Sequence, residues 1–521
     1  MDMLKYTKIS LKTSKVLFAF KADPWIRFKF RKEITILFNL FTISALCVSC
    51  KVHTFKKSIT PDLEIPENFA LAPNRIATKS EFWWKSFGSS ELNNLMVLAL
   101  EQNFDLKTSW NRLAQARATY VVNRAGQFPF LNLNNTASIT KATDKRPLDA
   151  SQQFIDIAES LGVPVIDGDL TTENIIIGSG LSYELDVWRR VKSLKESARF
   201  NLAASIEDVQ ATALLVSASV VDAWLSVRQQ VELLKLLREQ LNSNETQLEL
   251  LELRLSVGQA TSLDVLQQRQ QVAATEAAIP AMASILDTEQ NRLQILIGQI
   301  PIKGFVSTNE VALPEFTKLQ GVSTPLDLLN SRPDLRAAKK RINAADQDVA
   351  AAVANRLPRL SLNLTYDFQA TELAGPFHRE MTSVIGNLTG PIFEGGRRKA
   401  EVNRRKAILE EQLNQYTQLF LNSLLEVENA LIQEKRQNES IYYLEEQIKH
   451  VQQSLEESRA RYINGLNDYL PVLTSLQTKQ LLERNLILER RRRLAFRCNL
   501  LRALGGEWSK SLAVPNSQEA K

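Results

Sequence analysis

Histidine and cysteine are scarce in this sequence, with three of each among 521 residues. His53, His378 and His450 lie far apart and show no spacing typical of a metal site. Two of the three cysteines lie within the first 50 residues and only Cys498 lies beyond them, so no disulfide framework is expected within one chain. The sequence therefore predicts neither a metal site nor a bound cofactor.

Catalytic motifs are also missing. The sequence contains no phosphate-binding loop, no G-x-S-x-G nucleophile motif and no cysteine–histidine pairing. Glu426 and Glu428 are two residues apart in an expected helix, so their side chains point to different faces, which disfavours a paired-carboxylate acid–base site. We expect a protein that is not an enzyme.

The excess of positive charge belongs to the first 49 residues. They hold nine Lys and Arg against Asp2, Asp23 and Glu33, which accounts for the whole net charge of +6. The rest of the chain is balanced, so the pI near 9.0 gives little support to nucleic-acid binding. The basic run at residues 490–493 falls in a heptad-like helix and is interpreted as a solvated helix face.

The first residues are typical of a secretion signal. A basic segment precedes an uncharged, mostly apolar run at residues 34–48, which is too short to span a bilayer comfortably. The run ends in Leu46-Cys47-Val48-Ser49-Cys50, which resembles a bacterial lipobox with its leucine one place early. We predict a lipoprotein signal peptide at residues 1–49, lipidation of Cys50, and a lipidated tether at residues 50–88. An ordinary signal peptide or a buried thiol is the alternative.

Glycine and proline are absent from residues 181–257. Residues 181–188 alternate between apolar and polar side chains like a strand, and from Arg189 the apolar spacing becomes helical. Because no helix breaker precedes Gly258, the helix is expected to continue for roughly 65–70 residues, about 100 Å. Such a long helix needs partner helices along its whole length.

The same stretch occurs twice. Moving the sequence by 207 positions places Leu181 on Leu388, and further upstream an offset of 229 places Pro129 on Pro358. The first copy therefore has 22 more residues (229 − 207) between about residues 133 and 181. The pattern predicts a two-fold repeat of helix, strand, loop, strand, long helix and helix. We assign residues 89–298 to the first repeat, 299–324 to a linker, 325–505 to the second repeat and 506–521 to a tail.

Alternating segments precede each long helix. We expect a helix at about residues 91–127 and strands at about residues 130–140, 174–185, 360–368 and 382–393. Roughly ten residues with one apolar and one polar face fit a tilted membrane-barrel strand. Ordinary half-buried strands give the same pattern, so the prediction depends on four such segments in repeated positions behind a secretion signal.

Four strands cannot close around a water-filled lumen. An open edge in lipid would leave backbone groups unsatisfied, so several chains are expected to share one barrel. Three copies would supply twelve strands, an even number that encloses a lumen. The polar segments at about residues 141–173 and 370–381 would then face the outside of the cell.

Coiled-coil-like packing is predicted along the long helices. Apolar residues recur at heptad-like spacing, and charged residues fill many of the other positions. The aromatic cluster at residues 82–87 is interpreted as packing against the body of the protein. The heptad-like positions include Ala213, Val216, Val220, Ala223 and Val227 in the first copy and Leu421, Leu424, Val427 and Leu431 in the second.

Both long helices are expected to end in matched turns. Gly258 and Gly465 each follow a basic helix end, which is typical of a C-cap. Ser262 or Asn467 is expected to cap the returning helix. These turns lie at the end farthest from the strands, so any gate or partner contact at that end must use them.

With these motifs in place, the chain resembles the outer-membrane efflux protein family, the TolC/OprM-like outer-membrane factors, and in particular its lipoprotein branch associated with RND-type pumps. The matching motifs cover nearly everything after the leader, in family order. They are Tyr183-Glu-Leu-Asp-Val-Trp188, Arg254-x3-Gly258-x5-Asp264-Val-Leu, Ser331-Arg-Pro-Asp-Leu-Arg-Ala-Ala338, Pro391-Ile-Phe-Glu-Gly-Gly-Arg397, Glu426-Val-Glu-Asn-Ala-Leu431, Arg461-Tyr-x2-Gly465 and Leu504-Gly-Gly-x-Trp508.

The resemblance implies a mixed α/β membrane protein, mostly α, that forms a trimer with a twelve-stranded β-barrel in the outer-membrane lipid and a twelve-helix periplasmic tunnel. It implies a periplasmic adaptor docked on the two turns and an RND-type transporter in the inner membrane. By analogy, the adaptor-docking residues are Arg254, Val257, Gly258, Gln259, Arg461, Tyr462, Gly465 and Leu466, and the closed aperture is ringed by Asp468, Leu470, Thr474 and Gln477.

One departure from the family concerns the aperture. Relatives often carry an acidic residue and an arginine where Thr474 and Gln477 stand here, so an inherited salt-bridge latch is not expected. Opening would depend on adaptor-driven untwisting of helix pairs. Besides the efflux duct, the sequence allows two other functions: the duct of a type I protein-secretion system, and a lipid-anchored coiled-coil scaffold without a pore.

Overall fold

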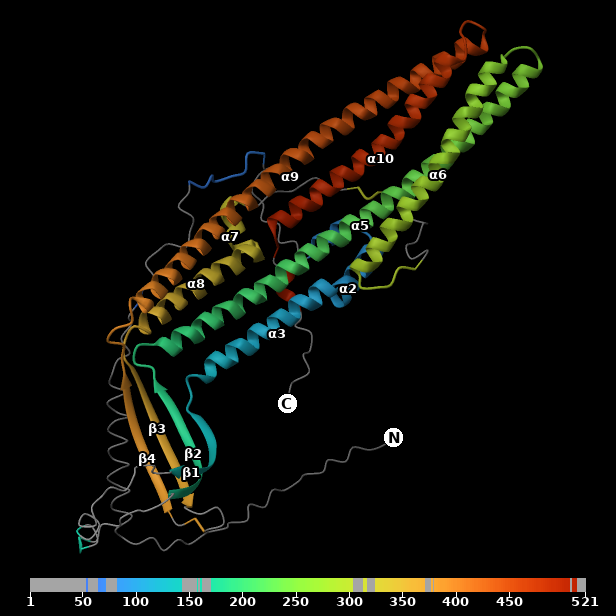
Figure 1. Ribbon diagram of the computed structural model, residues 1–521. Helices are drawn as coiled ribbons and strands as arrows, with labels where there is room; N and C mark the ends of the chain where they lie inside the picture. Colours follow the sequence, from blue (N-terminus) through green and yellow to red (C-terminus); the bar gives the residue numbers. More distant parts are fainter. Residues whose placement is uncertain are drawn as a thin grey trace, which may run out of the picture. The chain divides into compact units, whose positions relative to one another are not determined.

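The computed structural model in Figure 1 describes residues 53–54, 64–71, 82–142, 157, 160–161, 170–302, 313–315, 324–370, 376–377, 379–506 and 508–512. The predicted signal peptide and Cys50 lie outside these residues. The described chain forms two compact units: a strand unit within residues 130–189 and 358–389, and a helical unit from the remainder.

The strand unit is a four-stranded antiparallel sheet in the order β1-β2-β3-β4. Its strands are β1 (Phe130–Ala142), β2 (Leu170–Leu185), β3 (Arg359–Ala370) and β4 (Arg379–Thr389). All four strands predicted from alternation are present. The fourth ends at Thr389 and not near residue 393, because Gly390 and Pro391 follow and proline cannot donate to a strand ladder.

The sheet has one apolar and one polar face. A cross-strand row joins Leu131, Leu181, Leu364 and Val384, one from each strand. Side chains alternate across a strand, so the residues between these lie on the opposite face. That face carries mostly amides, hydroxyls and glycines: Asn132, Asn134, Thr136, Gly178, Gly180, Ser182, Asn363, Thr365 and Ser383. The predicted two-faced alternation is confirmed.

The helical unit repeats itself in matched lengths. The two long helices, α5 (Arg190–Ser256) and α9 (Arg397–Ile463), have 67 residues each. The returning helices, α6 (Ser262–Leu296) and α10 (Leu470–Leu504), have 35 residues each. The helices that precede the strands, α3 (Phe104–Ala125) and α8 (Pro333–Ala354), have 22 residues each. The shorter elements are η1 (Trp83–Phe87), α2 (Ser90–Gln102), η2 (Pro325–Asp327), α7 (Leu328–Ser331) and η3 (Trp508–Ser511).

The helix predicted at residues 91–127 is in fact two helices, which was not anticipated. The chain breaks at Asn103, whose side chain accepts a hydrogen bond from the Leu106 amide at 3.0 Å and so caps α3. Its amide nitrogen also donates to the Leu296 carbonyl at 2.8 Å. The second repeat breaks at the equivalent position, Arg332, directly before Pro333.

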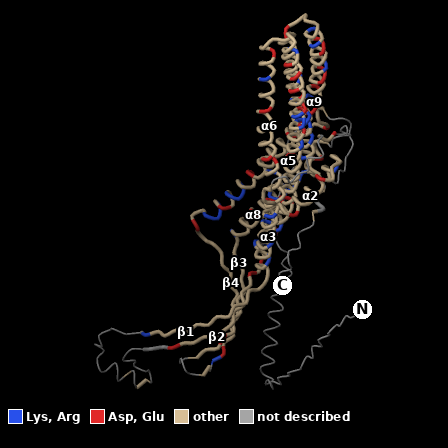
Figure 2. Tube along the Cα trace, turned by 90° about the vertical axis from the view of Figure 1, so that its right-hand side faces the viewer, with Lys and Arg blue, Asp and Glu red and all other residues tan. Residues whose placement is uncertain are grey.

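The core of the helical unit follows the heptad-like positions. Ala213, Val216, Val220, Ala223 and Val227 are all buried, as predicted. In the second copy Val427 and Leu431 are buried, but Leu421 is 42% exposed. Figure 2 shows that the charged residues are spread along the helices and are sparse on the strands. Among the described helices, α5 contains a stretch that is apolar and long enough to cross a membrane, although 61% of that stretch is buried inside the structure.

Part of the predicted tether belongs to the core. Phe69 is 4% exposed and packs in the hydrophobic cluster of the second repeat. Trp83, Trp84 and Phe87 are buried in the cluster of the first repeat, which confirms the packing role of the aromatic segment. Aromatic side chains bury large areas and so fix the described parts of this segment against the helices.

Candidate functional site at the helical hairpin tips

The turns that end the two long helices are built in the same way. Gly258 has φ of +74° and Gly465 has φ of +71°, a left-handed conformation that favours glycine. The Gln259 amide donates to the Arg254 carbonyl, and the Leu466 amide to the Arg461 carbonyl, both at 2.8 Å. These bonds satisfy helix-end carbonyls in a Schellman arrangement, so the predicted glycine C-caps are confirmed.

The returning helices are capped differently from the prediction. Thr261, and not Ser262, caps α6: its hydroxyl accepts from the Asp264 amide while the Asp264 carboxylate accepts from the Thr261 amide. In α10 the residue before the helix is Tyr469, which makes no side-chain cap, so Asn467 does not serve either. Pro471 occupies the first turn of α10, where no amide donor is needed.

The residues predicted to dock an adaptor fall into two groups. Val257 and Leu466 are 62% and 72% exposed, and the neighbouring Gly258, Gln259 and Gly465 are exposed as well. On both turns, the exposed surface thus includes a large apolar side chain next to a glycine. The remaining three are Arg254, half-buried, Arg461, whose Nε lies 2.7 Å from Glu457 Oε1, and Tyr462, buried.

Tyr462 joins the two hairpins. Its hydroxyl donates to Asp264 Oδ2 at 3.2 Å, and the Arg254 guanidinium lies over its ring at 5.2 Å from the centroid. Burial and the negative charge of Asp264 raise the pKa of Tyr462, so the phenol keeps its proton. Beside it, the Tyr469 hydroxyl donates to Gln268 Oε1 at 2.8 Å.

A series of amide contacts continues along the helices from these tyrosines. Gln477 Nε2 donates to Gln271 Oε1 at 2.8 Å, and Gln271 Nε2 donates to Gln480 Oε1 at 3.1 Å. Gln480 Nε2 in turn donates to Asn244 Oδ1 at 2.7 Å. These three contacts between α10 and the first hairpin are between neutral amides.

The predicted aperture residues lie on and just before α10. Asp468 and Thr474 are exposed and Leu470 is 56% exposed, whereas Gln477 is engaged in the amide series. The Thr474 hydroxyl donates to the Leu470 carbonyl at 2.9 Å. Sequence reasoning gave no role to Asp264, Gln268 and Tyr469, because each contacts a residue of the other repeat.

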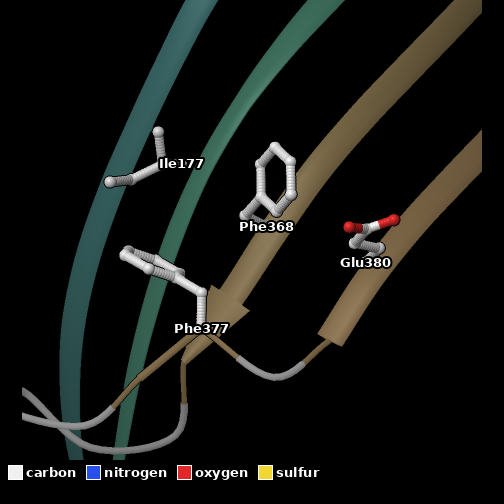
Figure 3. Close-up of a pocket in the computed structure, with 4 residues that line it drawn as sticks. All are labelled: Ile177, Phe368, Phe377 and Glu380. Atoms are coloured by element: carbon white, nitrogen blue, oxygen red, sulfur yellow. The ribbon is translucent and has the colours of Figure 1, made fainter. Parts of the chain in front are cut away.

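The strand unit carries a separate cavity, shown in Figure 3. It has a volume of about 640 Å³ and is lined by Ile177, Phe368, Phe377 and Glu380. Three of the four are apolar, and the cavity offers no nucleophile or paired acid and base. Within the described residues, no group of three or more His, Cys, Asp or Glu side chains is placed to hold a metal ion.

Known proteins match both the sequence and the architecture. The family model described as outer membrane efflux protein matches residues 95–299 and 324–506. The chain is 29% identical over 476 residues to the pyoverdine export outer membrane protein OpmQ of Pseudomonas aeruginosa, covering 90% of this chain and 97% of the relative. It is 24% identical over 465 residues to the cation efflux system protein CusC of Escherichia coli O157:H7, covering 86% and 94%. The solved outer-membrane channel OprN aligns with a TM-score of 0.79 at 26% identity, over 88% of this chain and 100% of that chain.

Proposed function

The chain belongs to the outer membrane efflux protein family, and on that premise we propose that three copies form the exit duct of a tripartite efflux pump. Outer-membrane efflux is the activity of its relatives, which are channel proteins. The family, the mostly helical fold with four antiparallel strands and the outer-membrane location predicted from the sequence are thus confirmed. The trimer, the partners and the roles of individual residues are proposals.

The observation that carries the proposal is the two-faced sheet with two open edges. One face suits lipid and the other suits water, and four strands are too few to close a barrel. Three copies would pair the edges and enclose a polar lumen of twelve strands. Light scattering of the detergent-extracted protein, with the detergent mass subtracted, tests this: we expect the mass of three chains, and a stable monomer would refute the duct.

The duct is proposed to conduct small molecules passively, with energy from an RND-type transporter in the inner membrane. OpmQ is named for pyoverdine export and CusC for cation efflux, so one architecture serves chemically different cargo. The polar sheet face, mostly uncharged amides and hydroxyls, fits a lumen that makes few specific contacts with its cargo.

The hairpin tips are proposed as the docking surface for a periplasmic adaptor. Val257 and Leu466 are apolar, exposed and adjacent to exposed glycines, which allow close approach by a partner helix. Aspartate at either position should reduce export and cross-linking to the adaptor. Ile295→Asp is the matched control, because Ile295 is 60% exposed at the opposite end of α6. Equal losses in all three variants would count against a specific tip site.

Closure is proposed to occur at Asp468, Leu470, Thr474 and Gln477. Among these four residues, Gln477 joins the hairpins by a hydrogen bond between neutral amides, which contributes only about 1 kcal/mol. Separation of the helix pairs by the adaptor would therefore open the aperture without breaking an ion-pair latch.

Lipidation of Cys50 is proposed as a second membrane anchor. It is supported by the lipobox-like residues before Cys50 and by the apolar run before them. Mass spectrometry of the mature N-terminus should find an acylated cysteine at position 50, and Cys50→Ser should lose the added mass. An unmodified N-terminus at another residue would refute it.

A further inference from the structure

The two hairpins of the sheet are paired in the same register, residue for residue. In the first hairpin Leu131 lies opposite Leu181. Adding the repeat offsets of 229 and 207 to these positions gives Leu360 and Leu388, which lie opposite each other in the second hairpin. The repeat is therefore a structural symmetry of the sheet at the level of single residues.

This symmetry extends to the seam between repeats. Within one chain, β2 of the first repeat pairs with β3 of the second and sets Ser179 opposite Tyr366. Among the described strands, β1 and β4 form the two edges of the sheet and have one neighbour each. In the repeat, β4 corresponds to β2 and β1 corresponds to β3. A pairing of β4 with the β1 of another copy would therefore be the repeat-equivalent of the pairing between β2 and β3.

We propose that β4 of one copy pairs antiparallel with β1 of the next copy in the register that sets Gly386 opposite Ala137 and Val384 opposite Ile139. The partner is a second copy of this chain, and the inference rests on the proposed shared barrel. A slip of one residue would move the apolar side chains to the polar face, so the competing registers are two residues away. They set Gly386 opposite Asn135 or opposite Ile139.

Exposure at the free edges agrees with this seam. Leu133 on β1 is 74% exposed and Leu388 on β4 is 71% exposed. Their repeat-equivalents at the internal seam, Leu362 and Leu181, are half-buried. Pairing with a second copy would partly bury Leu133 and Leu388, as the internal seam does their equivalents. It would also supply hydrogen-bond partners for backbone groups at both sheet edges.

Residue sizes are complementary at one position of the proposed seam. At the internal seam Gly178 lies opposite Asp367, and a Cβ on Gly178 would lie 1.8 Å from a carboxylate oxygen of Asp367. The equivalent pair is Ile385 opposite Ser138 of the next copy. At this position the larger side chain is on β3 at the internal seam and on β4 at the proposed one, so at both seams a large residue lies opposite a small one.

Cysteine pairs test the register. Gly386→Cys is combined in turn with Ala137→Cys, Asn135→Cys and Ile139→Cys, and the membranes are oxidised. Opposite residues have Cα atoms about 4.5–5.5 Å apart, within disulfide range, whereas diagonal residues are about 7–8 Å apart. A Cβ at position 386 meets nothing within 4 Å, so this variant leaves the protomer fold unchanged. Within one chain β1 and β4 are three strands apart, roughly 14 Å, so only bonds between copies form.

We expect the Gly386–Ala137 pair to give several-fold more covalent product than either flanking pair, in a ladder that ends at three chains. Single-cysteine variants, which should give no ladder, serve as controls. Strongest product from a flanking pair, or no product from a protein of trimeric mass, overturns the register. A monomeric mass by light scattering overturns the proposed duct itself, so the two failures are distinguishable.

Discussion

Replacing Tyr462 by phenylalanine should loosen the joined hairpin tips. The change removes one hydroxyl, which donates to Asp264 Oδ2 at 3.2 Å, and keeps the ring under Arg254. A hydrogen bond to a charged group contributes about 1.5–3 kcal/mol, and a distance longer than is usual for an O–H···O bond favours the lower value. Asp264 retains its bond from the Thr261 amide at 3.0 Å, so the cap of α6 survives.

A loss of about 1.5 kcal/mol corresponds to roughly a tenfold change in the equilibrium between joined and separated tips in each copy. Because the pKa of Tyr462 is raised by burial and by Asp264, the phenol donates throughout the neutral range. The difference between wild type and Tyr462→Phe should therefore not depend on pH between roughly 6 and 8.

Hydrogen exchange of the backbone amides in residues 254–270 and 461–480 measures the effect. We expect exchange faster by up to about tenfold in both segments, together with greater entry of large antibiotics that the outer membrane normally excludes. Tyr443→Phe is the matched control, since Tyr443 lies on the same helix and is 70% exposed. Unchanged exchange in both segments would refute the role of Tyr462 in joining the hairpins.

Three further predictions concern the aperture, the glycine turns and the buried thiol. Leu470→Gly with Thr474→Gly should raise permeability to large antibiotics, and unchanged permeability would show that these residues do not form the constriction. Gly258→Ala should cost about 1–2 kcal/mol from the left-handed backbone alone, whereas Gly298→Ala should lower the melting temperature much further, because its Cβ would lie 2.5 Å from the Gln102 carbonyl oxygen. Cys498 is 3% exposed and burial raises its pKa, so it should react with maleimide only after unfolding; rapid labelling of the folded protein would contradict its buried placement.

Much of the fold could be predicted because sequence patterns that extend over many residues stay recognisable even where single positions deviate. The absence of glycine and proline in residues 181–257 predicts one long helix, and α5 has 67 residues. The break at Asn103 was not predicted, because its cause is a side chain that caps α3 and also reaches the Leu296 carbonyl of a distant helix. Local sequence contains the cap but not the distant partner.

The end of β4 was placed four residues too late for a related reason. Apolar residues such as Ile392 and Phe393 continue after the strand, and hydrophobic patterning alone extends it. The pair Gly390-Pro391 ends the ladder by removing a donor. The position of Pro391, which cannot continue a strand ladder, is the signal in the sequence that marks the end of β4.

The docking residues could be located from the sequence because the two turns resemble each other, but the contacts that join the hairpins could not. Repeat analysis selects positions that are alike in both copies. In the Tyr462–Asp264 pair both residues differ between the copies: Asp264 corresponds to Pro471, and Tyr462 corresponds to Leu255. Neither residue of this pair has a polar counterpart in the other copy, so comparison of the copies does not select it. In this chain the similarity of the repeats is enough to locate the turns, whereas the Tyr462–Asp264 contact depends on residues in which the repeats differ.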